Sequence, residues 1–186
     1  GAEDDRSLGA NDLKALHLTE DDSVVSIAAS GRTPYVLGAL DYAKSVGALT
    51  IAVTCCPGCE AEAHADIAIS PAPGPEVITG STRMKSGTAQ KMILNMISTG
   101  VMVKLGKVYG NLMVDVKASN EKLRERCVRI VRQATGAEDA AARAALIETN
   151  YACKPAIVML LLGVDKTRAE TLLTRANGRV AEALEG

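Results

Sequence analysis

Two segments of the chain combine glycine, hydroxyl and cationic residues in a way that suits an anion. Residues 77–91, "VITGSTRMKSGTAQK", hold two glycines, five Ser/Thr residues, three cations and no acid. Residues 29–34, "ASGRTP", place the hydroxyls of Ser30 and Thr33 around Gly31. A helix that starts directly after such a segment adds free N–H groups and the positive end of its dipole. Both segments are therefore predicted to bind an anionic group.

Each segment also has a simpler interpretation. Thr33 and Pro34 suit the ordinary start of a helix, as its cap and first residue, although Ser30 and Gly31 are not needed for that. The longer segment could be a solvated helix start, but cations there oppose the helix dipole. Arg83 and Lys85 are thus expected to meet a negative ligand or the carboxylate of Glu76.

The glycine spacing in the longer segment excludes one common phosphate site. A Walker A motif needs four residues between its glycines and a lysine directly after the second. Here six residues separate Gly80 from Gly87, and Thr88 follows. A nucleoside triphosphate is therefore not the expected ligand.

Short β-branched runs and a helical pattern predict the frame that positions these segments. Residues 23–29, 49–54 and 65–70 read as buried strands, and residues 34–47 as a helix that ends at Gly47. The crossover between the first two strands predicts parallel, right-handed pairing. Ligands of such sheets bind where strands end, which is where residues 29–34 lie. Three strands are fewer than the average of about five or six strands in a sheet. The sheet is therefore expected to lack its first part or to be completed in an oligomer.

The second half of the chain reads as mostly helical. Residues 91–106 are apolar on most faces and predict a buried helix. Residues 108–118 fit either a strand or an extended connector. An amphipathic helix over 119–136, capped by Ser119 or Asn120 and stopped by Gly136, is followed by helical segments near 138–149, 154–162, 166–176 and 178–184. We therefore divide the chain into an α/β domain, residues 1–118, and a helical subdomain, residues 119–186.

Composition narrows the class of protein. The 186 residues include no Trp, no Phe and four Tyr, which argues against a base-stacking nucleic-acid surface. A net charge of −1 gives no general attraction to nucleic acid or to anionic membranes. We expect no transmembrane helix, no signal peptide and a reducing, cytoplasmic setting.

Three of the five cysteines stand in "CCPGC", residues 55–59. The spacing resembles a zinc knuckle, but a structural zinc site needs four ligands, and only His64 is near in the sequence. We favour a cysteine-rich turn at a strand end and expect no metal. Cys127 and Cys153 lie in apolar helical patterns and read as core residues.

The two anion-binding segments carry a family resemblance. "SIAASGRTPYV" is similar to the sugar-isomerase (SIS) phosphosugar-binding fold, and "GPEVITGSTRMKSGTAQK" resembles the signature shared by N-acetylmuramic acid 6-phosphate etherases and the glucokinase regulatory protein. "GKVYGNLMVDVKASNEKLRERCVRIV" continues the etherase pattern. The resemblance implies a flavodoxin-like three-layer sandwich with a parallel sheet, followed by a small helical bundle, in a cytoplasmic homodimer.

The etherase resemblance also implies a reaction, without metal or organic cofactor. Such enzymes cleave the D-lactyl ether of N-acetylmuramic acid 6-phosphate, in cell-wall sugar recycling, to N-acetylglucosamine 6-phosphate and D-lactate. A base removes the C2 proton of the open-chain sugar, lactate leaves from C3, and water then adds. One family glutamate lies in a "GAED" segment, which matches residues 1–4 and makes Glu3 the catalytic candidate.

The resemblance assigns the substrate-binding residues. Ser30 and Thr33 would hold the 6-phosphate, with Gly31 giving backbone access. Ser81 and Thr82 would reach the same sugar phosphate, and Arg83 and Lys85 would supply charge or pin the loop to Glu76. Lys154, in "ACKPAI", matches a lysine that approaches the sugar phosphate in the regulatory relative, although a surface lysine of a helix is the simpler interpretation.

One departure from the etherase pattern matters for activity. The family's second glutamate and its G-T-S-G phosphate loop precede "GAED" and are not in this sequence. The chain thus resembles the C-terminal portion of an etherase, and we expect it to be inactive by itself. The alternatives are a non-catalytic phosphosugar-binding regulatory module and a helical interaction protein.

Overall fold

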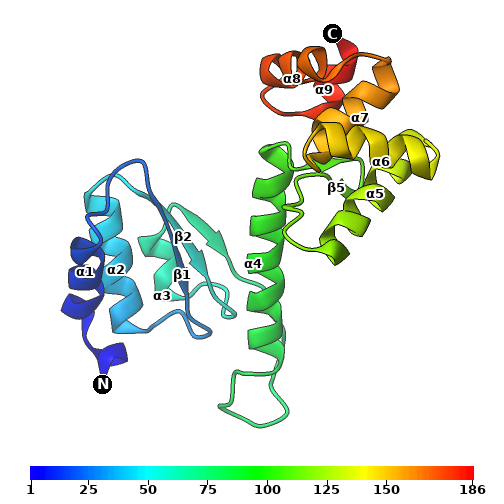
Figure 1. Cartoon of the computed structure of the whole chain (residues 1–186). Coiled ribbons are helices and arrows are strands. Elements are labelled where there is room, and N and C mark those ends of the chain that lie inside the picture. The colour runs from blue at the N-terminus through cyan, green and yellow to red at the C-terminus, as the bar shows by residue number, and fades with distance from the viewer. The chain divides into compact units, whose positions relative to one another are not determined.

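The structure, a computed structural model, describes residues 1–186 and divides into two compact units, residues 1–96 and 97–186 (Figure 1). Their division falls inside one helix, α4 (Lys85–Lys104). It reflects contacts within each half, and the domain boundary between residues 118 and 119 stays a prediction.

A parallel three-stranded sheet is the centre of the first unit. Strands β1 (Ser23–Ile27), β2 (Leu49–Val53) and β3 (Ile67–Ile69) lie in the order β1-β2-β3, with Val25 opposite Ile51 and Ile51 opposite Ile67. All three predicted strands are confirmed: β1 and β2 are slightly shorter than their apolar runs, and β3 is half as long as predicted. The expected α/β class is confirmed as well.

Helices pack against one face of this sheet. Helix α2 (Pro34–Ser45) forms the crossover from β1 to β2, and the short helix α3 (Glu60–His64) follows β2. Leu37 and Leu40 of α2 contact Ala52 of β2 and Ala61 of α3 in a small buried core. The opposite face is also aliphatic, yet its Ile27, Leu49 and Ile67 are 43%, 42% and 45% exposed.

Helix α1 (Arg6–Ala15) packs on the outer side of α2 (Figure 1). Asp5 caps it, because its carboxylate accepts hydrogen bonds from the backbone N–H groups of Ser7 and Leu8. A one-turn 3₁₀ helix, η1 (Ala2–Asp4), precedes it. Helix α1 was not predicted, because the acidic composition of residues 1–22 conceals its pattern, although Asp5 is a recognisable cap.

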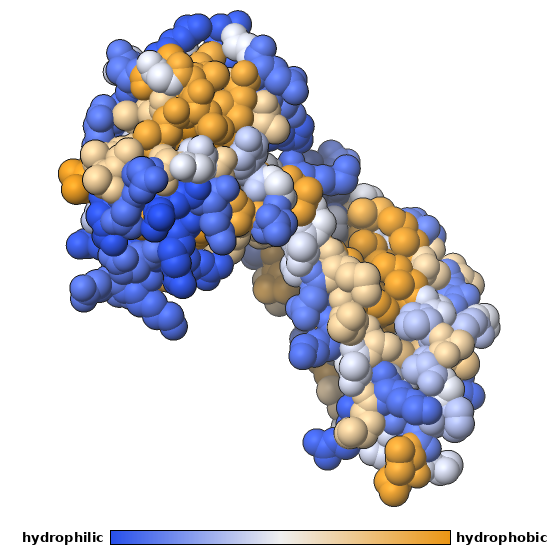
Figure 2. Space-filling view, turned by 90° about the vertical axis from the view of Figure 1, so that its right-hand side faces the viewer, coloured by the Kyte–Doolittle hydropathy of each residue, from blue (hydrophilic) through white to orange (hydrophobic).

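Helix α4 begins six residues before the predicted apolar run, and its predicted burial is wrong in this structure. Only Ser86 and Ile93 of its 20 residues are buried. Met92, Met96, Val101 and Val103 are 53%, 60%, 47% and 50% exposed. Hydrophobic residues reach the surface in broad patches on the face shown in Figure 2. A helix this apolar normally lies inside a core. The fold of this chain does not cover most of the apolar side chains of α4.

The second unit is a helical bundle with the larger core. Two strands of two residues each, β4 (Val108–Tyr109) and β5 (Leu112–Met113), form an antiparallel hairpin. Of the ambiguous segment, residues 108–113 are therefore strands with a turn, and residues 114–118 are a connector without regular structure. Helices α5 (Glu121–Thr135), α6 (Asp139–Glu148), α7 (Cys153–Leu162), α8 (Lys166–Arg175) and α9 (Val180–Glu185) follow. These match the predicted helical segments.

The caps of α5 are confirmed in detail. The Asn120 side chain accepts a hydrogen bond from the Leu123 backbone N–H, and Gly136 ends the helix in the left-handed region at φ 71°. Cys127 and Cys153 are buried in the bundle core, as predicted. No helix in the structure is long and apolar enough to cross a membrane.

Candidate functional site

A pocket of about 490 Å³ lies at the carboxyl end of β1, within the first unit. It collects residues from η1, from the β1–α2 loop, from the first turn of α2 and from the loop before α4. Its lining residues are Glu3, Ile27, Ala28, Ala29, Ser30, Thr33, Tyr35, Val36 and Thr82. Four predicted site residues from three separate parts of the sequence thus line one cavity.

The β1–α2 loop is held in place by its backbone. The Ala29 carbonyl accepts a hydrogen bond from the Cys55 N–H at 2.9 Å, and the Gly31 carbonyl accepts one from the Ala61 N–H at 3.0 Å. Gly31 is buried with φ +63°, a conformation that favours glycine. The loop therefore presents its side chains from a fixed backbone.

Thr33 occupies the cap position of α2 without acting as a side-chain cap. Its hydroxyl forms no capping hydrogen bond, and Pro34 fills the first helical position. Thr33, Tyr35 and Val36 all line the pocket, so the N-terminal end of α2 opens onto it. This leaves a hydroxyl, free N–H groups and a helix dipole for an anion, which favours the ligand-binding interpretation over ordinary capping.

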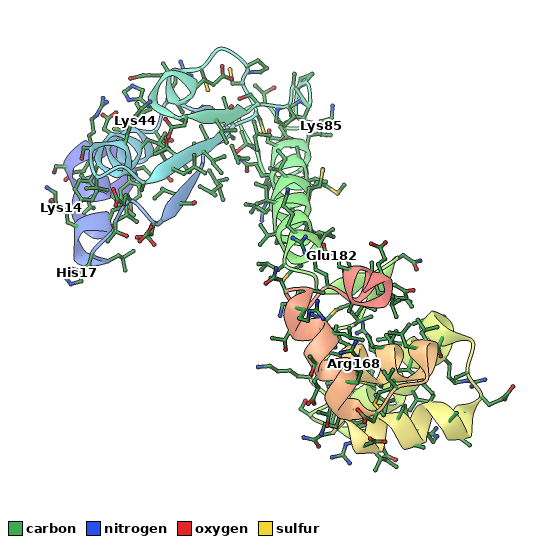
Figure 3. All side chains as sticks on the ribbon, turned by 90° about the horizontal axis from the view of Figure 1, so that it is seen from above. Lys14, His17, Lys44, Lys85, Arg168 and Glu182 are labelled. Carbon is green, nitrogen blue, oxygen red and sulfur yellow. The ribbon has the colours of Figure 1, made fainter.

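The loop before α4 contributes less to the pocket than predicted. Of its four predicted residues, Thr82 lines the pocket, whereas Ser81, Arg83 and Lys85 do not. Arg83 and Lys85 are exposed and form no ion pair, and Figure 3 shows Lys85 at the N-terminal end of α4. Their charge remains available to a ligand.

Glu76 meets this loop by a different contact from the one expected. Its carboxylate accepts hydrogen bonds from the backbone N–H groups of Lys85, at 3.0 Å, and Ser86, at 3.1 Å. These bonds hold the pKa of Glu76 below its usual value. Glu76 therefore caps α4 and fills the N-terminus that an anionic ligand would otherwise occupy.

Glu3 is the only carboxylate that lines the pocket. It lies in η1, is exposed to solvent and forms no ion pair. Asp5, two residues on, anchors the start of α1, and α1 packs on α2. The position of Glu3 beside the β1–α2 loop thus depends on the contact between α1 and α2.

Tyr35 lines the pocket but was not a predicted site residue. Its hydroxyl donates a hydrogen bond to Asp12 of α1 at 2.9 Å, which raises the pKa of Tyr35. The bond ties the first turn of α2 to α1. No sequence signal could reveal it, because the partner lies on a helix that was not predicted.

The family models divide the chain much as the structure does. Residues 9–99 match the SIS domain, and residues 110–157 match the C-terminal lid domain of glucokinase regulatory protein. The first match contains both β1 and the two predicted anion-binding loops. Residues 9–99, just under half of the chain, are therefore similar to a SIS domain.

Curated relatives of the chain confirm its resemblance to the etherases. Proteins named N-acetylmuramic acid 6-phosphate etherase from Caldanaerobacter subterraneus and Pectobacterium atrosepticum are both 59% identical, over 99% and 100% of this chain. The Vibrio cholerae protein of that name, numbered 1, is 55% identical over 98% of the chain. The chain spans 60%, 61% and 61% of the lengths of these relatives.

Lys154 lies in the second unit, in the segment that matches the lid domain of glucokinase regulatory protein. It lines a pocket of about 480 Å³ together with Asp115, Glu170 and Thr174. Burial lowers the pKa of Lys154, although Asp115, which also pairs with Lys107, opposes the shift. The side chain is therefore partly desolvated, unlike a lysine that extends freely from a helix surface.

The cysteine-rich turn is not part of a cluster of potential metal ligands. No group of three or more His, Cys, Asp or Glu residues is placed to hold a metal ion, and all five cysteines are free. Cys55 and Cys59 instead contact the two loops of the site.

Proposed function

We propose that this chain is the sugar-phosphate-binding portion of an N-acetylmuramic acid 6-phosphate etherase. The proposed reaction is cleavage of the D-lactyl ether of that sugar, by elimination and hydration, to N-acetylglucosamine 6-phosphate and D-lactate. It is a carbon–oxygen lyase reaction of amino-sugar recycling. The names of the relatives support this assignment, and the SIS-domain match supports a phosphosugar as substrate.

One observation carries the proposal: Glu3, Ser30, Thr33 and Thr82 line a single pocket. A carboxylate and hydroxyls near a helix N-terminus, in one pocket, suit a substrate with an acidic carbon and a phosphate. We assign Ser30 and Thr33 to the 6-phosphate, with Gly31 giving it access to the backbone. Thr82 reaches the same sugar phosphate from the second loop.

The remaining predicted residues have supporting roles in the proposal. Ser81 shares the loop of Thr82, and Arg83 and Lys85 provide positive charge near the phosphate, since neither forms an ion pair within the chain. Lys154 is proposed as a further substrate-binding residue, since its partly desolvated ammonium group lines a pocket of its own. No metal or organic cofactor enters the proposed reaction.

Glu3 is proposed to transfer one of the two protons that the reaction moves. Elimination removes a proton at C2 and assists a leaving group at C3, which calls for two positioned groups. Because Glu3 is the only carboxylate in the pocket, we propose that this chain binds the sugar phosphate but does not turn it over. The alternative function, a non-catalytic phosphosugar-binding module, makes the same prediction for binding.

We also propose a homodimer in the cytoplasm. The exposed apolar residues of α4 and of the open sheet face support association with a second copy. The five free thiols suit a reducing compartment.

Calorimetric titration tests the binding site. We expect N-acetylglucosamine 6-phosphate to bind and unphosphorylated N-acetylglucosamine to bind far more weakly. Thr33→Val should weaken binding of the phosphate sugar by roughly tenfold or more, the worth of one hydrogen bond to a charged group. Thr167→Val, at an exposed threonine of α8, is the matched control and should leave affinity unchanged.

A D-lactate assay with N-acetylmuramic acid 6-phosphate tests the catalytic part. No release is expected from this chain. Turnover that disappears in Glu3→Gln would contradict the proposed inactivity while supporting the catalytic role of Glu3. Equal affinity of the wild type and of Thr33→Val would refute the phosphate site.

A further inference from the structure

The turn "CCPGC", residues 55–59, contacts both loops of the candidate site. The Cys55 N–H donates to the Ala29 carbonyl of the first loop at 2.9 Å. The Cys55 thiol lies 3.7 Å from the Ser86 carbonyl, at the start of α4, and donates to it. The backbone that follows β2 therefore joins the two segments that we assign to the sugar phosphate.

The Cys59 thiol packs directly against the glycine of the first loop. A Cβ atom placed on Gly31 would lie 2.2 Å from Cys59 Sγ and 2.8 Å from Cys59 Cβ. The thiol also donates to Thr54 Oγ1 at 3.5 Å. Cys59 thus supports Gly31 at the point where the loop adopts φ +63°, and no other side chain lies as close.

Cys56 is the accessible member of the turn. It is exposed, whereas Cys55 and Cys59 are half-buried and Cys127 and Cys153 are buried. Cys56, Pro57, Gly58 and Cys59 have the C-x-x-C spacing of dithiols that cycle between thiol and disulfide. Gly58 turns the chain with φ +76°, and a Cβ atom on it would meet no heavy atom within 4 Å, so the turn has room to change shape.

We propose that Cys56 and Cys59 form a reversible disulfide that weakens sugar-phosphate binding, an inference that rests on the proposed function. The oxidant is a low-molecular-weight disulfide such as oxidised glutathione. The Cys56 thiolate attacks one of its sulfurs and releases one thiol, and the Cys59 thiolate then attacks the mixed disulfide and releases the second. Two protein thiols lose two protons and two electrons, and one small disulfide becomes two small thiols.

The disulfide acts on the site because it moves one sulfur. To bond Cys56, Cys59 Sγ must leave its contact with Gly31, and the loop that carries Ser30 and Thr33 loses its support. Coupling of this kind is reciprocal. A bound sugar phosphate, which orders the loop, should therefore slow formation of the disulfide.

The test combines oxidation with mapping and titration of the whole chain. After incubation with oxidised glutathione, the protein should be lighter by two hydrogens, and peptide mapping should join Cys56 to Cys59. The dissociation constant for N-acetylglucosamine 6-phosphate should rise by roughly fivefold or more, within the usual range of coupled sites, and dithiothreitol should restore it. Cys56→Ser is the control: it should bind like the reduced protein and not respond to oxidation.

Two results would overturn the proposal: no Cys56–Cys59 disulfide in folded protein, or a mapped disulfide that leaves loop and affinity unchanged. Amide hydrogen exchange of Cys55 and Ala61, whose N–H groups donate to the Ala29 and Gly31 carbonyls of the loop, gives a readout that needs no ligand, and it should rise on oxidation. If reduced protein binds no sugar phosphate, the proposed function fails, while the exchange measurement still decides whether the disulfide controls the loop.

Discussion

At Gly31, one missing side chain fixes the geometry of the candidate site. The residue needs a left-handed backbone, and the position of its absent Cβ is occupied by the thiol of Cys59. Glycine is therefore required there for two independent reasons, conformation and space. Thr33, two residues on, can direct its hydroxyl to a ligand because the loop does not need it as a cap.

Gly31→Ala should destabilise the protein more than Gly58→Ala does, because only Gly31 packs against Cys59. Both glycines have positive φ, so each substitution should cost about 1–2 kcal/mol of unfolding free energy through backbone strain. Only Gly31→Ala must also displace a packed thiol, which should add about 1–3 kcal/mol. Urea unfolding of the two variants measures the difference.

The double variant Gly31→Ala, Cys59→Ala tests that cause. Removing the thiol should restore part of the unfolding free energy that Gly31→Ala loses beyond Gly58→Ala. The loss caused by backbone strain should remain. Equal stabilities of Gly31→Ala and Gly58→Ala would show that the Cys59 side chain can move away from residue 31 without loss of stability.

Among the elements, the crossing of α1 over α2 determines where Glu3 lies. A Cβ on Gly9 would approach the Tyr35 carbonyl oxygen to 2.1 Å, and one on Gly38 would approach the Arg6 carbonyl oxygen to 1.9 Å. Two glycines, one on each helix, therefore allow the backbones to touch. The contact carries η1, and with it Glu3, to the mouth of the β1–α2 loop.

Gly9→Ala or Gly38→Ala should force the helices apart. Neither carbonyl can rotate away as a flexible side chain would, so we expect a loss of about 1–3 kcal/mol in unfolding free energy. Gly100→Ala in α4, where a Cβ meets nothing within 4 Å, should instead be neutral or stabilising by up to about 1 kcal/mol. Urea denaturation compares the three variants, and a Gly9→Ala protein as stable as Gly100→Ala would argue against the close crossing.

Asp41 of α2 links three helices, and this link should depend on pH. Its carboxylate pairs with Arg6 of α1 at 2.6 Å and with His64 of α3. Burial raises the pKa of Asp41, but the hydrogen bonds from Arg6 and His64 outweigh it, so the pKa lies below its usual value. A lowered pKa in the folded state stabilises the protein above the unfolded pKa, and the contribution is lost as pH falls through the folded one.

Unfolding midpoints in urea between pH 7 and pH 3 measure this contribution. The wild type should lose stability as the medium becomes acidic below about pH 4. Asp41→Asn should be less stable at neutral pH and should show a smaller loss on acidification, because other paired carboxylates keep their own dependence. Parallel curves for the two proteins would mean that Asp41 contributes no pH-dependent stability.

Local sequence patterns were sufficient to predict most helices and strands, but not the contacts between residues that are distant in the sequence. The strands, α2 and the helices of the second unit follow from apolar runs, caps and glycine stops, which act within a few residues. The cap of α4 by Glu76 and the bond between Tyr35 and Asp12 join residues that are distant in sequence or lie on an unpredicted helix. For the site, the sequence indicated Ser30, Thr33 and Thr82, which line one pocket. The absence of Ser81, Arg83 and Lys85 from the pocket lining required coordinates.

Across the whole molecule, many apolar side chains are exposed to water, which is energetically unfavourable. Val77 and Ile78, in the loop before α4, are 83% and 69% exposed, and the apolar side chains of α4 and of the open sheet face add to them. Exposed apolar surface on this scale marks an interaction site in stable proteins. A second copy of the chain would cover it, in keeping with the proposed homodimer.

Sedimentation velocity over a range of concentrations tests this association. The wild type should sediment as a dimer, and Met96→Lys, which places a charge on the exposed face of α4, should shift it toward monomer while the helix content seen by circular dichroism stays the same. Lys166→Met, at a site on α8 in the second unit, is the control for altered charge and should leave the dimer intact. A wild-type chain that remains monomeric and cooperatively folded at high concentration would show that this surface needs no second copy, and the homodimer proposal would then be withdrawn.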